Sequence, residues 1–123
     1  MPEQAKDRIG RRGERTARRF LRWRQGYRIV ERNWRLPRFG ELDIVALDGQ
    51  MLVFVEVKTR RADSLAIPED AITPDKQHRM RRLAQAFIGQ HGFDHLPCRF
   101  DVVAVTVRSW PRPSQVTHYK DAF

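Results

Sequence analysis

The sequence predicts an α/β fold in which a mixed central sheet is flanked by helices. Two segments, 6–25 and 74–91, carry apolar side chains at helical spacing, and strand-like apolar runs lie between and after them. The strand at 50–60 connects through a helix to the strand at 98–107, so we expect these two strands to be parallel neighbours in a right-handed crossover. The 123 residues suit a single domain, 1–123, with the element order αβββαβ.

The first helix is predicted from Lys6 to Gln25, where Gly26 provides a stop signal. One face of this helix is apolar and is expected to pack on the sheet, while arginines cover most of the remainder. A first strand is predicted from Tyr27 to Trp34. The apolar stripe of the helix contains Ile9, Gly13, Ala17, Phe20 and Leu21, with Trp23 or Arg24 as its continuation.

A hairpin gives the clearest strand signal. Residues 41–47 and 50–60 have strand-like patterns, and Asp48-Gly49 joins them as a strong two-residue turn signal. Alternation places one set of apolar side chains on a single face of the two strands, which is expected to face the core. That set contains Leu42, Ile44, Ala46, Met51, Val53, Val55 and Val57.

The C-terminal half supplies the second helix and the last strand. Thr73 can cap the helix, Pro74 suits its first turn, and Gly92 ends it. The strand at 98–107 is apolar on both faces, so we expect it near the centre of the sheet. The tail, 109–123, contains two prolines and is predicted to be irregular.

The charge of the chain favours nucleic acid as a partner. The net charge is +9 with a pI near 10.9, and arginine forks match phosphate oxygens well. An anionic membrane is disfavoured because the basic helix needs its apolar face for the core. Trp23, Trp34 and Trp110 can stack on bases, but aromatic residues near strand ends more often belong to the core. The predicted phosphate-binding residues of the first helix are Arg11, Arg12, Arg15, Arg18, Arg19 and Arg22.

The chain has no secretory or membrane signal, so we expect a cytoplasmic protein without membrane contact. No unbroken apolar stretch is long enough to cross a bilayer, and the single cysteine, Cys98, cannot form an internal disulfide. His91, His95 and Cys98 resemble zinc ligands in spacing, but Gly92 and Pro97 interrupt them and a fourth ligand is lacking. A connecting loop is therefore the favoured interpretation of this segment.

The second face of the hairpin carries charged side chains. A two-residue turn at 48–49 places Glu41 opposite Glu56 and Asp43 opposite Phe54, and alternation brings Lys58 to the same face. Two carboxylates roughly 5 Å apart repel by on the order of 3 kcal/mol at an effective dielectric of about 20. A divalent cation can offset that repulsion, and hard oxygen ligands indicate Mg²⁺ or Mn²⁺.

Two interpretations of these acids are open. They can be solvated side chains that pair with the many arginines, or they can form a catalytic centre. The position of Glu56-Val57-Lys58 at the end of an apolar strand favours the catalytic centre. Alternation sets the glutamate and the lysine roughly 7 Å apart on one face, so the carboxylate can hold a metal while the ammonium reaches a water or a phosphate.

These residues resemble the motif of the PD-(D/E)xK, or restriction-endonuclease-like, superfamily. Asp43 matches its first acid and Glu56-Val57-Lys58 its E-x-K half. More closely, the chain is similar to the small bacterial YraN/UPF0102 family. The matching segments are Gly13-Glu14, the Asn33 region, Gly40-Glu41-Leu42-Asp43, Phe54-Val55-Glu56-Val57-Lys58, Lys76 and Arg99-Phe100-Asp101-Val102-Val103.

The resemblance implies a restriction-endonuclease-like αβββαβ core and a metal-dependent nuclease. Asp43 and Glu56 would hold Mg²⁺ or Mn²⁺, helped by the Val57 carbonyl and by Glu41, and Lys58 would position the attacking water. In this sequence Leu42 stands in the place of the proline that gives the superfamily its name. The loop at 63–68 also lacks the aromatic-glycine pair expected before its proline.

Two further residues have both a functional and a structural interpretation. Archaeal Holliday-junction resolvases, which are similar in core order, place a helix glutamate near the metal, which implies a catalytic role for Glu14; the alternative is a surface pair with Arg18. Lys76 lies in register with the apolar stripe of the second helix. It either extends outward to solvent and nucleic acid or approaches the acidic face.

We therefore expect an endonuclease that hydrolyses DNA phosphodiester bonds, with branched or structured DNA as a substrate by analogy with the resolvases. A homodimer would allow two strands to be cut. The alternative is a non-catalytic module that keeps the same fold and only binds nucleic acid.

Overall fold

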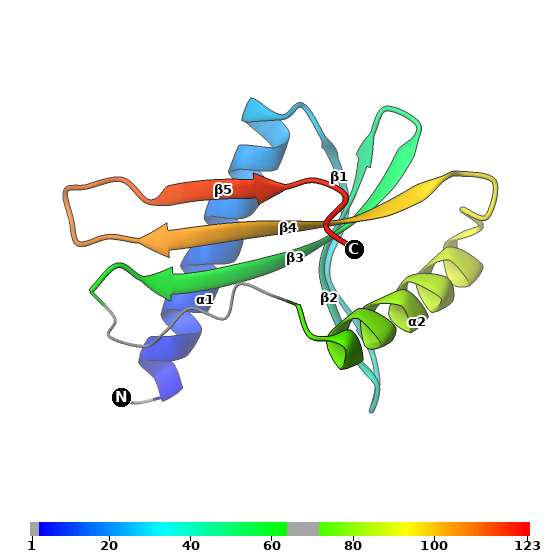
Figure 1. Ribbon diagram of the computed structural model, residues 1–123, viewed down its shortest axis with the longest axis horizontal. Coiled ribbons are helices and arrows are strands. Elements are labelled where there is room, and N and C mark those ends of the chain that lie inside the picture. Colours follow the sequence, from blue (N-terminus) through cyan, green and yellow to red (C-terminus); the bar gives the residue numbers. More distant parts are fainter. Residues whose placement is uncertain (1–2, 64–71) are drawn as a thin grey trace.

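The computed structural model describes residues 3–63 and 72–123 (Figure 1). The segment 64–71, which holds most of the loop predicted before the second helix, lies outside the described residues. The elements are, in order, α1 (Glu3–Arg19), the π-helical turn η1 (Phe20–Arg24), β1 (Arg28–Leu36), β2 (Gly40–Asp48), β3 (Met51–Arg61), α2 (Pro74–His91), β4 (Cys98–Val107) and β5 (Gln115–Tyr119).

The five strands form one mixed sheet in the order β1-β2-β3-β4-β5. β3 and β4 are parallel and connect through α2, whereas the other neighbours are antiparallel. The predicted α/β class, the central position of β4 and the crossover are confirmed. The ends of α2 are also as predicted: the Thr73 hydroxyl accepts from the backbone N–H of Lys76 at 3.2 Å, and Gly92 has a φ of 70°.

The prediction of an irregular tail was wrong, because residues 115–119 form β5 along the free edge of β4. The two tail prolines lie in the turn before β5, where they remove no hydrogen bond from the sheet. The five residues of β5 alternate between exposed and half-buried, as an edge strand with one solvated face does. The two prolines led to the prediction of an irregular tail, although the short segment after them pairs with the preceding strand, β4.

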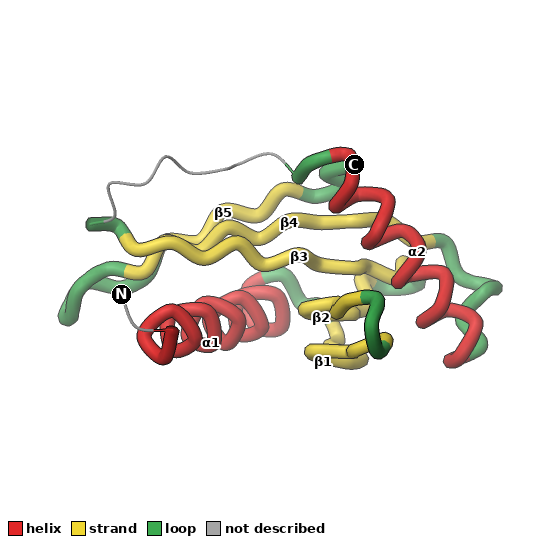
Figure 2. Tube along the Cα trace, turned by 90° about the horizontal axis from the view of Figure 1, so that it is seen from below, coloured by secondary structure: helices red, strands yellow, loops and turns green. Residues whose placement is uncertain are grey.

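The two helices cover opposite faces of the sheet (Figure 2). α1 packs across β3 and β4, and α2 packs against β2. One buried cluster lies beneath α1 and includes Ala17, Leu21, Ile44, Val55 and Val105. The second lies beneath α2 and includes Leu42, Val45, Phe54, Leu83 and Phe87.

Leu42 was expected on the same face as Ile44, and this was wrong, because Leu42 packs in the α2 cluster. β1 and β2 turn out of the plane of β3–β5 in Figure 2, so the side chains along β2 change the helix that they face. Asn33, on the neighbouring strand, has a φ of 51°, a left-handed value, and the register of the β1–β2 ladder shifts between Ile29 and Glu31.

The hairpin register also differs from the prediction. Val45 pairs with Phe54 and Asp48 with Met51, so Gly49 and Gln50 form the turn instead of Asp48 and Gly49. The φ of Gly49 is 61°, which a glycine adopts without strain as the first turn residue. The shift amounts to two residues along the ladder. An even shift leaves the alternation along each strand unchanged but changes the residue that lies opposite each acid.

Candidate active site

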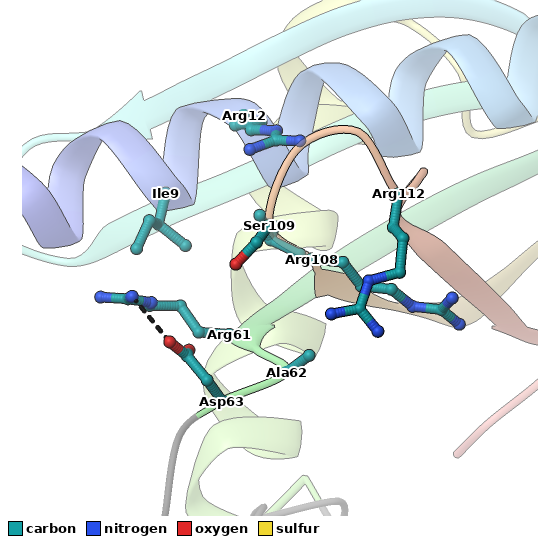
Figure 3. Close-up of a pocket in the computed structure, with 9 residues that line it drawn as sticks. Ile9, Arg12, Arg61, Ala62, Asp63, Arg108, Ser109 and Arg112 are labelled. Carbon is teal, nitrogen blue, oxygen red and sulfur yellow. Dashed lines mark hydrogen bonds and ion pairs between the residues drawn. The ribbon is translucent and has the colours of Figure 1, made fainter.

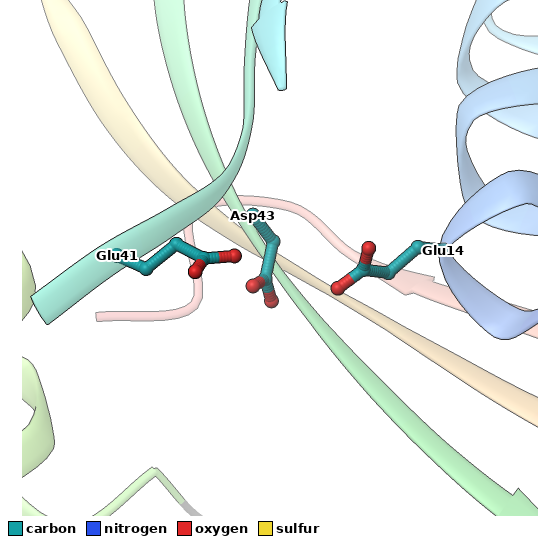
Figure 4. A group of neighbouring side chains, drawn as sticks. All are labelled: Glu14, Glu41 and Asp43. Atoms are coloured by element: carbon teal, nitrogen blue, oxygen red, sulfur yellow. The ribbon is translucent and has the colours of Figure 1, made fainter. Parts of the chain in front are cut away.

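Three carboxylates converge where α1 approaches the bent part of β2 (Figure 4). Glu14 comes from α1, and Glu41 and Asp43 come from β2. One carboxylate oxygen from each lies within 4.8 Å of the other two. Of the two interpretations of Glu14, the structure therefore favours a position beside the acids of the sheet.

Gly13 explains how α1 comes so close to the sheet. A Cβ atom added to this residue would overlap the side chain of Thr59 on β3. The backbone of α1 therefore contacts β3 directly at this point, and the next residue, Glu14, extends toward the acids of β2 (Figure 4). The sequence analysis assigned Gly13 to the apolar stripe without this role in positioning Glu14.

Asp43 is the most perturbed acid of the site. Its Oδ2 accepts a hydrogen bond of 2.9 Å from the backbone N–H of Val57. Burial, followed by the neighbouring Glu56, raises the pKa of Asp43 to about 8. Burial and the charge of Glu41 also raise the pKa of Glu14. When they are ionised, the acids of the site therefore carry more negative charge than the protein's own cations neutralise well.

Glu56 is buried and forms an ion pair with Lys76, whose Nζ lies 3.2 Å from its Oε2. This contact decides between the two interpretations of Lys76, which approaches the acidic face from α2. The predicted opposition of Glu41 and Glu56 was wrong, because the register shift moves Glu41 along the strand. Glu41 pairs instead with Arg35, at 3.1 Å.

Asn33 joins the site although the sequence analysis gave it no role. With its amide turned to match the hydrogen-bonding partners, the nitrogen lies 3.1 Å from Glu14 Oε2 and 3.1 Å from Glu41 Oε1. The left-handed φ of this residue aims its short side chain at the acids. Asparagine inside a predicted strand, where it is disfavoured, was the available signal.

Lys58 lies two residues after Glu56 on β3 and is half-buried. The alternation of β3 therefore places the glutamate and the lysine on one face, as predicted. Within the described ranges, 3–63 and 72–123, no ion pair involves the Lys58 ammonium.

Comparison with known proteins identifies the family at this point. Residues 13–105 match the profile described as "Uncharacterised protein family UPF0102". The chain belongs to the UPF0102 family. Its relatives include a UPF0102 protein of Syntrophus aciditrophicus, 44% identical over 94% of this chain and 88% of the relative. A UPF0102 protein of Rhodococcus jostii is 45% identical over 94% and 95% of the two chains, and one of Symbiobacterium thermophilum is 50% identical over 80% and 81%.

The matched range contains every acid of the UPF0102 site described above. The description of the family names no activity, so the resemblance to PD-(D/E)xK nucleases and to archaeal resolvases stays a prediction. None of the helices in the described part of the chain has the length and apolar character needed to span a membrane.

The arginines of this UPF0102 chain separate into two surfaces. Arg11, Arg15 and Arg18 lie beside the acidic site, in a hollow of about 350 Å³ that also includes Glu14 and Asn33. A second hollow of about 300 Å³ adjoins it farther along the helix. Its lining consists of Arg18, Arg19, Arg22, Trp23, Ile29 and Arg32.

Arg12 points to a separate basic pocket (Figure 3). This pocket has a volume of about 410 Å³ and includes Arg61, Arg108 and Arg112 from the ends of β3 and β4 and the turn before β5. Arg61 pairs with Asp63 at 2.9 Å. The predicted single arginine face of α1 is thus divided between two sides of the helix.

A second buried acid, Asp101, has a structural environment. Its carboxylate accepts from Arg99 Nε at 3.0 Å and from the backbone N–H of Asp121 at 2.9 Å, and it lies 2.8 Å from His118 Nε2. The pKa of Asp101 is lowered, because these donors outweigh the opposing effect of burial. This network ties β4 to β5. His91, considered above as a zinc ligand, stacks on Phe87 with 3.9 Å between ring centroids.

Proposed function

We propose that this protein is a metal-dependent nuclease that hydrolyses phosphodiester bonds, with DNA as the expected substrate. The convergence of Glu14, Glu41 and Asp43 within 4.8 Å, with Glu56 next to Asp43, is the observation that carries the proposal. The resemblance to the PD-(D/E)xK motif supports the same chemistry. Structured or branched DNA and a homodimer remain expectations of that resemblance, and a cytoplasmic location remains an expectation from the sequence.

The donor set fits a hard divalent cation. All three groups offer carboxylate oxygen, and oxygen ligands at about 2.1 Å from Mg²⁺ lie about 3 Å apart when adjacent and about 4 Å apart when opposite. The 4.8 Å limit on the carboxylates is close to that spacing. Burial of Asp43 beside Glu56 gives a further reason for a cation, because the ionised acids repel each other. When bound, Mg²⁺ or Mn²⁺ supplies an acidified water and a positive charge near the reacting phosphate.

The protein residues take separate roles in this proposal. Asp43 and Glu14 hold the cation, and the Val57 N–H keeps the Asp43 carboxylate in place. Lys58 contacts the scissile phosphate and orients the attacking water, which is an electrostatic role for a fixed ammonium. Lys76 supplies a positive charge beside the buried Glu56 carboxylate.

The supporting groups and the substrate surface complete the proposed site. Asn33 holds Glu14 and Glu41 near each other through one amide nitrogen. The arginines along α1 bind the phosphate backbone without recognising its sequence. The Val57 carbonyl is a further expected ligand, from the family resemblance.

A non-catalytic nucleic-acid-binding module on the same fold is the second candidate. The charge of +9 and the arginine-lined hollows favour it equally. The two candidates differ at the acids. A binding module has no use for three carboxylates next to its phosphate-binding surface, because they repel the backbone.

A cleavage assay separates them. The intact protein is incubated with Mg²⁺ or Mn²⁺ and labelled linear, flapped, single-stranded and four-way DNA, and with RNA. We expect metal-dependent cutting that falls at least about 100-fold in Asp43→Asn and in Lys58→Ala, since each removes an interaction with developing charge. Asp94→Asn is the matched control, because this exposed acid lies in the loop before β4.

Circular dichroism confirms the fold of each variant. Cutting that survives Asp43→Asn comes from a contaminant or another site and contradicts the proposal. Absence of cutting by the intact protein, together with salt-sensitive binding, supports the binding module.

A further inference from the structure

We propose that the groove between α1 and β1 binds an unpaired stretch of nucleic acid, with one base stacked on Trp23. This inference rests on the proposed function and specifies its substrate: a strand with unpaired nucleotides next to the cleavage site. The groove consists of the two hollows beside α1, from Glu14 and Asn33 at one end to Trp23 at the other.

Trp23 lies in an unusual place for its size. The sequence analysis expected it in the core, but 72% of the residue is exposed at the end of the first helical segment. Trp34, by contrast, packs edge-on against Phe87 at 5.4 Å and belongs to the α2 cluster. The guanidinium of Arg22 lies 4.9 Å from the Trp23 ring centroid. A flat aromatic surface beside cations is the arrangement on which single-stranded nucleic acids stack their bases.

The two hollows form one continuous path because both include Arg18 and Arg32. The first, of about 350 Å³, reaches Glu14 of the acidic site. The second, of about 300 Å³, reaches Trp23 and Ile29. A strand that follows this path has cations along its phosphates, the carboxylates at one end and an aromatic ring at the other.

The charge along the path is suited to a polyanion. Arg18 is half-buried between other guanidinium groups, and its pKa is lowered by burial first and by Arg32 next. Like charges held this close repel one another, and bound phosphates relieve that repulsion. Five further arginines contribute to the two hollows: Arg11, Arg15, Arg19, Arg22 and Arg32.

The length of the path sets the length of the unpaired segment. Trp23 lies nine positions after Glu14 in the sequence, and a helical rise of 1.5 Å per residue gives about 14 Å. Stacked nucleotides rise about 3.4 Å each along a strand, so the groove spans about four of them. A base in a duplex is stacked between its neighbours and cannot lie on Trp23. Binding at this end therefore requires unpaired nucleotides.

An anionic membrane surface is the competing partner, because tryptophan and arginine also occur together at interfaces. The apolar side chains of the groove are few: Trp23 and Ile29 are the large ones in its lining. The carboxylates at the far end would also lie against an anionic surface. Both features favour a strand over a membrane, and anionic vesicles therefore enter the test as a probe.

The test measures binding in EDTA, so that cleavage does not contribute. The probes are a single-stranded DNA and its RNA counterpart, a duplex with a four-nucleotide overhang, a blunt duplex, and vesicles of phosphatidylserine and phosphatidylcholine. Trp23→Ala is expected to weaken single-strand and overhang binding about 5- to 150-fold, the range for loss of one stacked base. Blunt-duplex binding should change less than about twofold, since no base reaches Trp23.

Two matched controls separate stacking and groove charge from general effects. Trp110→Ala removes an aromatic residue that is 90% exposed in the turn before β5 and should leave all binding unchanged. Arg18→Ala with Arg32→Ala should lower the salt dependence of single-strand binding by about 1.4 in slope, or 0.7 per lost contact. Arg108→Ala with Arg112→Ala removes equal charge from the other pocket and should leave that slope unchanged.

A spectroscopic readout tests the stacking itself. Single-stranded DNA should quench part of the tryptophan fluorescence, and Trp23→Phe should lose that quenching while it keeps most of the affinity. The proposal is overturned if Trp23→Ala leaves single-strand binding unchanged, or if Trp110→Ala weakens it equally. It is also overturned if the substitution abolishes vesicle binding and spares nucleic acid.

The result of this binding test does not depend on whether the protein cleaves nucleic acid. If Trp23→Ala cuts DNA with the same preference for unpaired strands as the intact protein, the nuclease proposal stands and the groove proposal is wrong. If a base stacks on Trp23 but the protein shows no metal-dependent cutting, the groove proposal stands as the surface of a binding module and the nuclease proposal is wrong.

Discussion

At the scale of single residues, the candidate site contains carboxyl groups whose ionised form is disfavoured by their burial in the fold. Asp43 is buried beside Glu56, and its carboxylate has one backbone donor, the Val57 N–H at 2.9 Å. Lys76 supplies a positive charge from α2, but its ion pair is with Glu56. The protein without a cation therefore carries an electrostatic cost at Asp43, which makes the stability of the apoprotein sensitive to pH.

The sign of that sensitivity follows from the raised pKa of Asp43, about 8 in the fold against 3.8 for an ordinary aspartate. Between these values the folded state binds more protons than the unfolded chain, so the free energy of unfolding falls as the pH rises. Asp43→Asn removes the titration and keeps an oxygen for the Val57 N–H. In EDTA, we expect the variant to exceed the intact protein in stability by about 1–3 kcal/mol at pH 8.5 and to match it near pH 4.5.

Urea unfolding at the two pH values measures this difference. Asp94→Asn, an exposed acid remote from the site, is expected to follow the intact protein at both. Parallel stability profiles for Asp43→Asn and the intact protein would show that Asp43 is not perturbed.

At the scale of elements, the approach of α1 to β3 brings Glu14 to the acids of β2. Gly13 allows that approach, because any side chain there would overlap Thr59. Gly10, one turn earlier on the same helix, has open space around its Cα. Substitutions at the two glycines therefore distinguish the effect of helix propensity from the effect of close packing against β3.

Gly13→Ala and Gly10→Ala are expected to have opposite effects. In an exposed helical position alanine is favoured over glycine by about 1 kcal/mol, so Gly10→Ala should raise the free energy of unfolding by about that amount. Gly13→Ala gains the same propensity but forces α1 away from β3, at a cost of about 1–3 kcal/mol for overpacking. It should also weaken Mg²⁺ binding, because Glu14 moves with the helix.

Thermal unfolding and isothermal titration with Mg²⁺ test both variants. Equal stabilisation by the two substitutions would mean that α1 does not contact β3 at Gly13.

At the scale of the whole molecule, the acids of the site come from separate elements. Glu14 is on α1 and Asp43 on β2, and Glu56 on β3 is held by Lys76 of α2. A cation bound among these acids would therefore link α1 to the sheet in the folded state. The unfolded chain has no such arrangement, so the binding energy adds to the stability of the fold.

Mg²⁺ is therefore expected to stabilise the intact protein. At 100 times the dissociation constant, the gain is about 2.7 kcal/mol for one site. Glu14→Gln and Asp43→Asn should lose most of this gain, whereas Asp94→Asn should keep it. Calorimetric melting with and without Mg²⁺ at constant ionic strength measures the effect, and equal stabilisation of all four proteins would indicate nonspecific ion binding.

The sequence by itself determined the fold class, the crossover and the identity of the main acids. These features depend on local periodicity and on alternation along one strand, which are present in the order of the residues. The face shared by Glu56 and Lys58 was predictable for this reason, because the two residues lie two positions apart on one strand. Thr73 and Gly92 fixed the ends of α2 by the same kind of local chemistry.

Only the tertiary structure decided which residues from different elements meet. The edge pairing of β5 with β4, the ion pair of Lys76 with Glu56 and the amide of Asn33 between two carboxylates each join different elements of the fold. The exposure of Trp23 depends on where α1 lies on the sheet rather than on the helical period. Such contacts are set by the packing and twist of the sheet, and no local pattern in the chain encodes them.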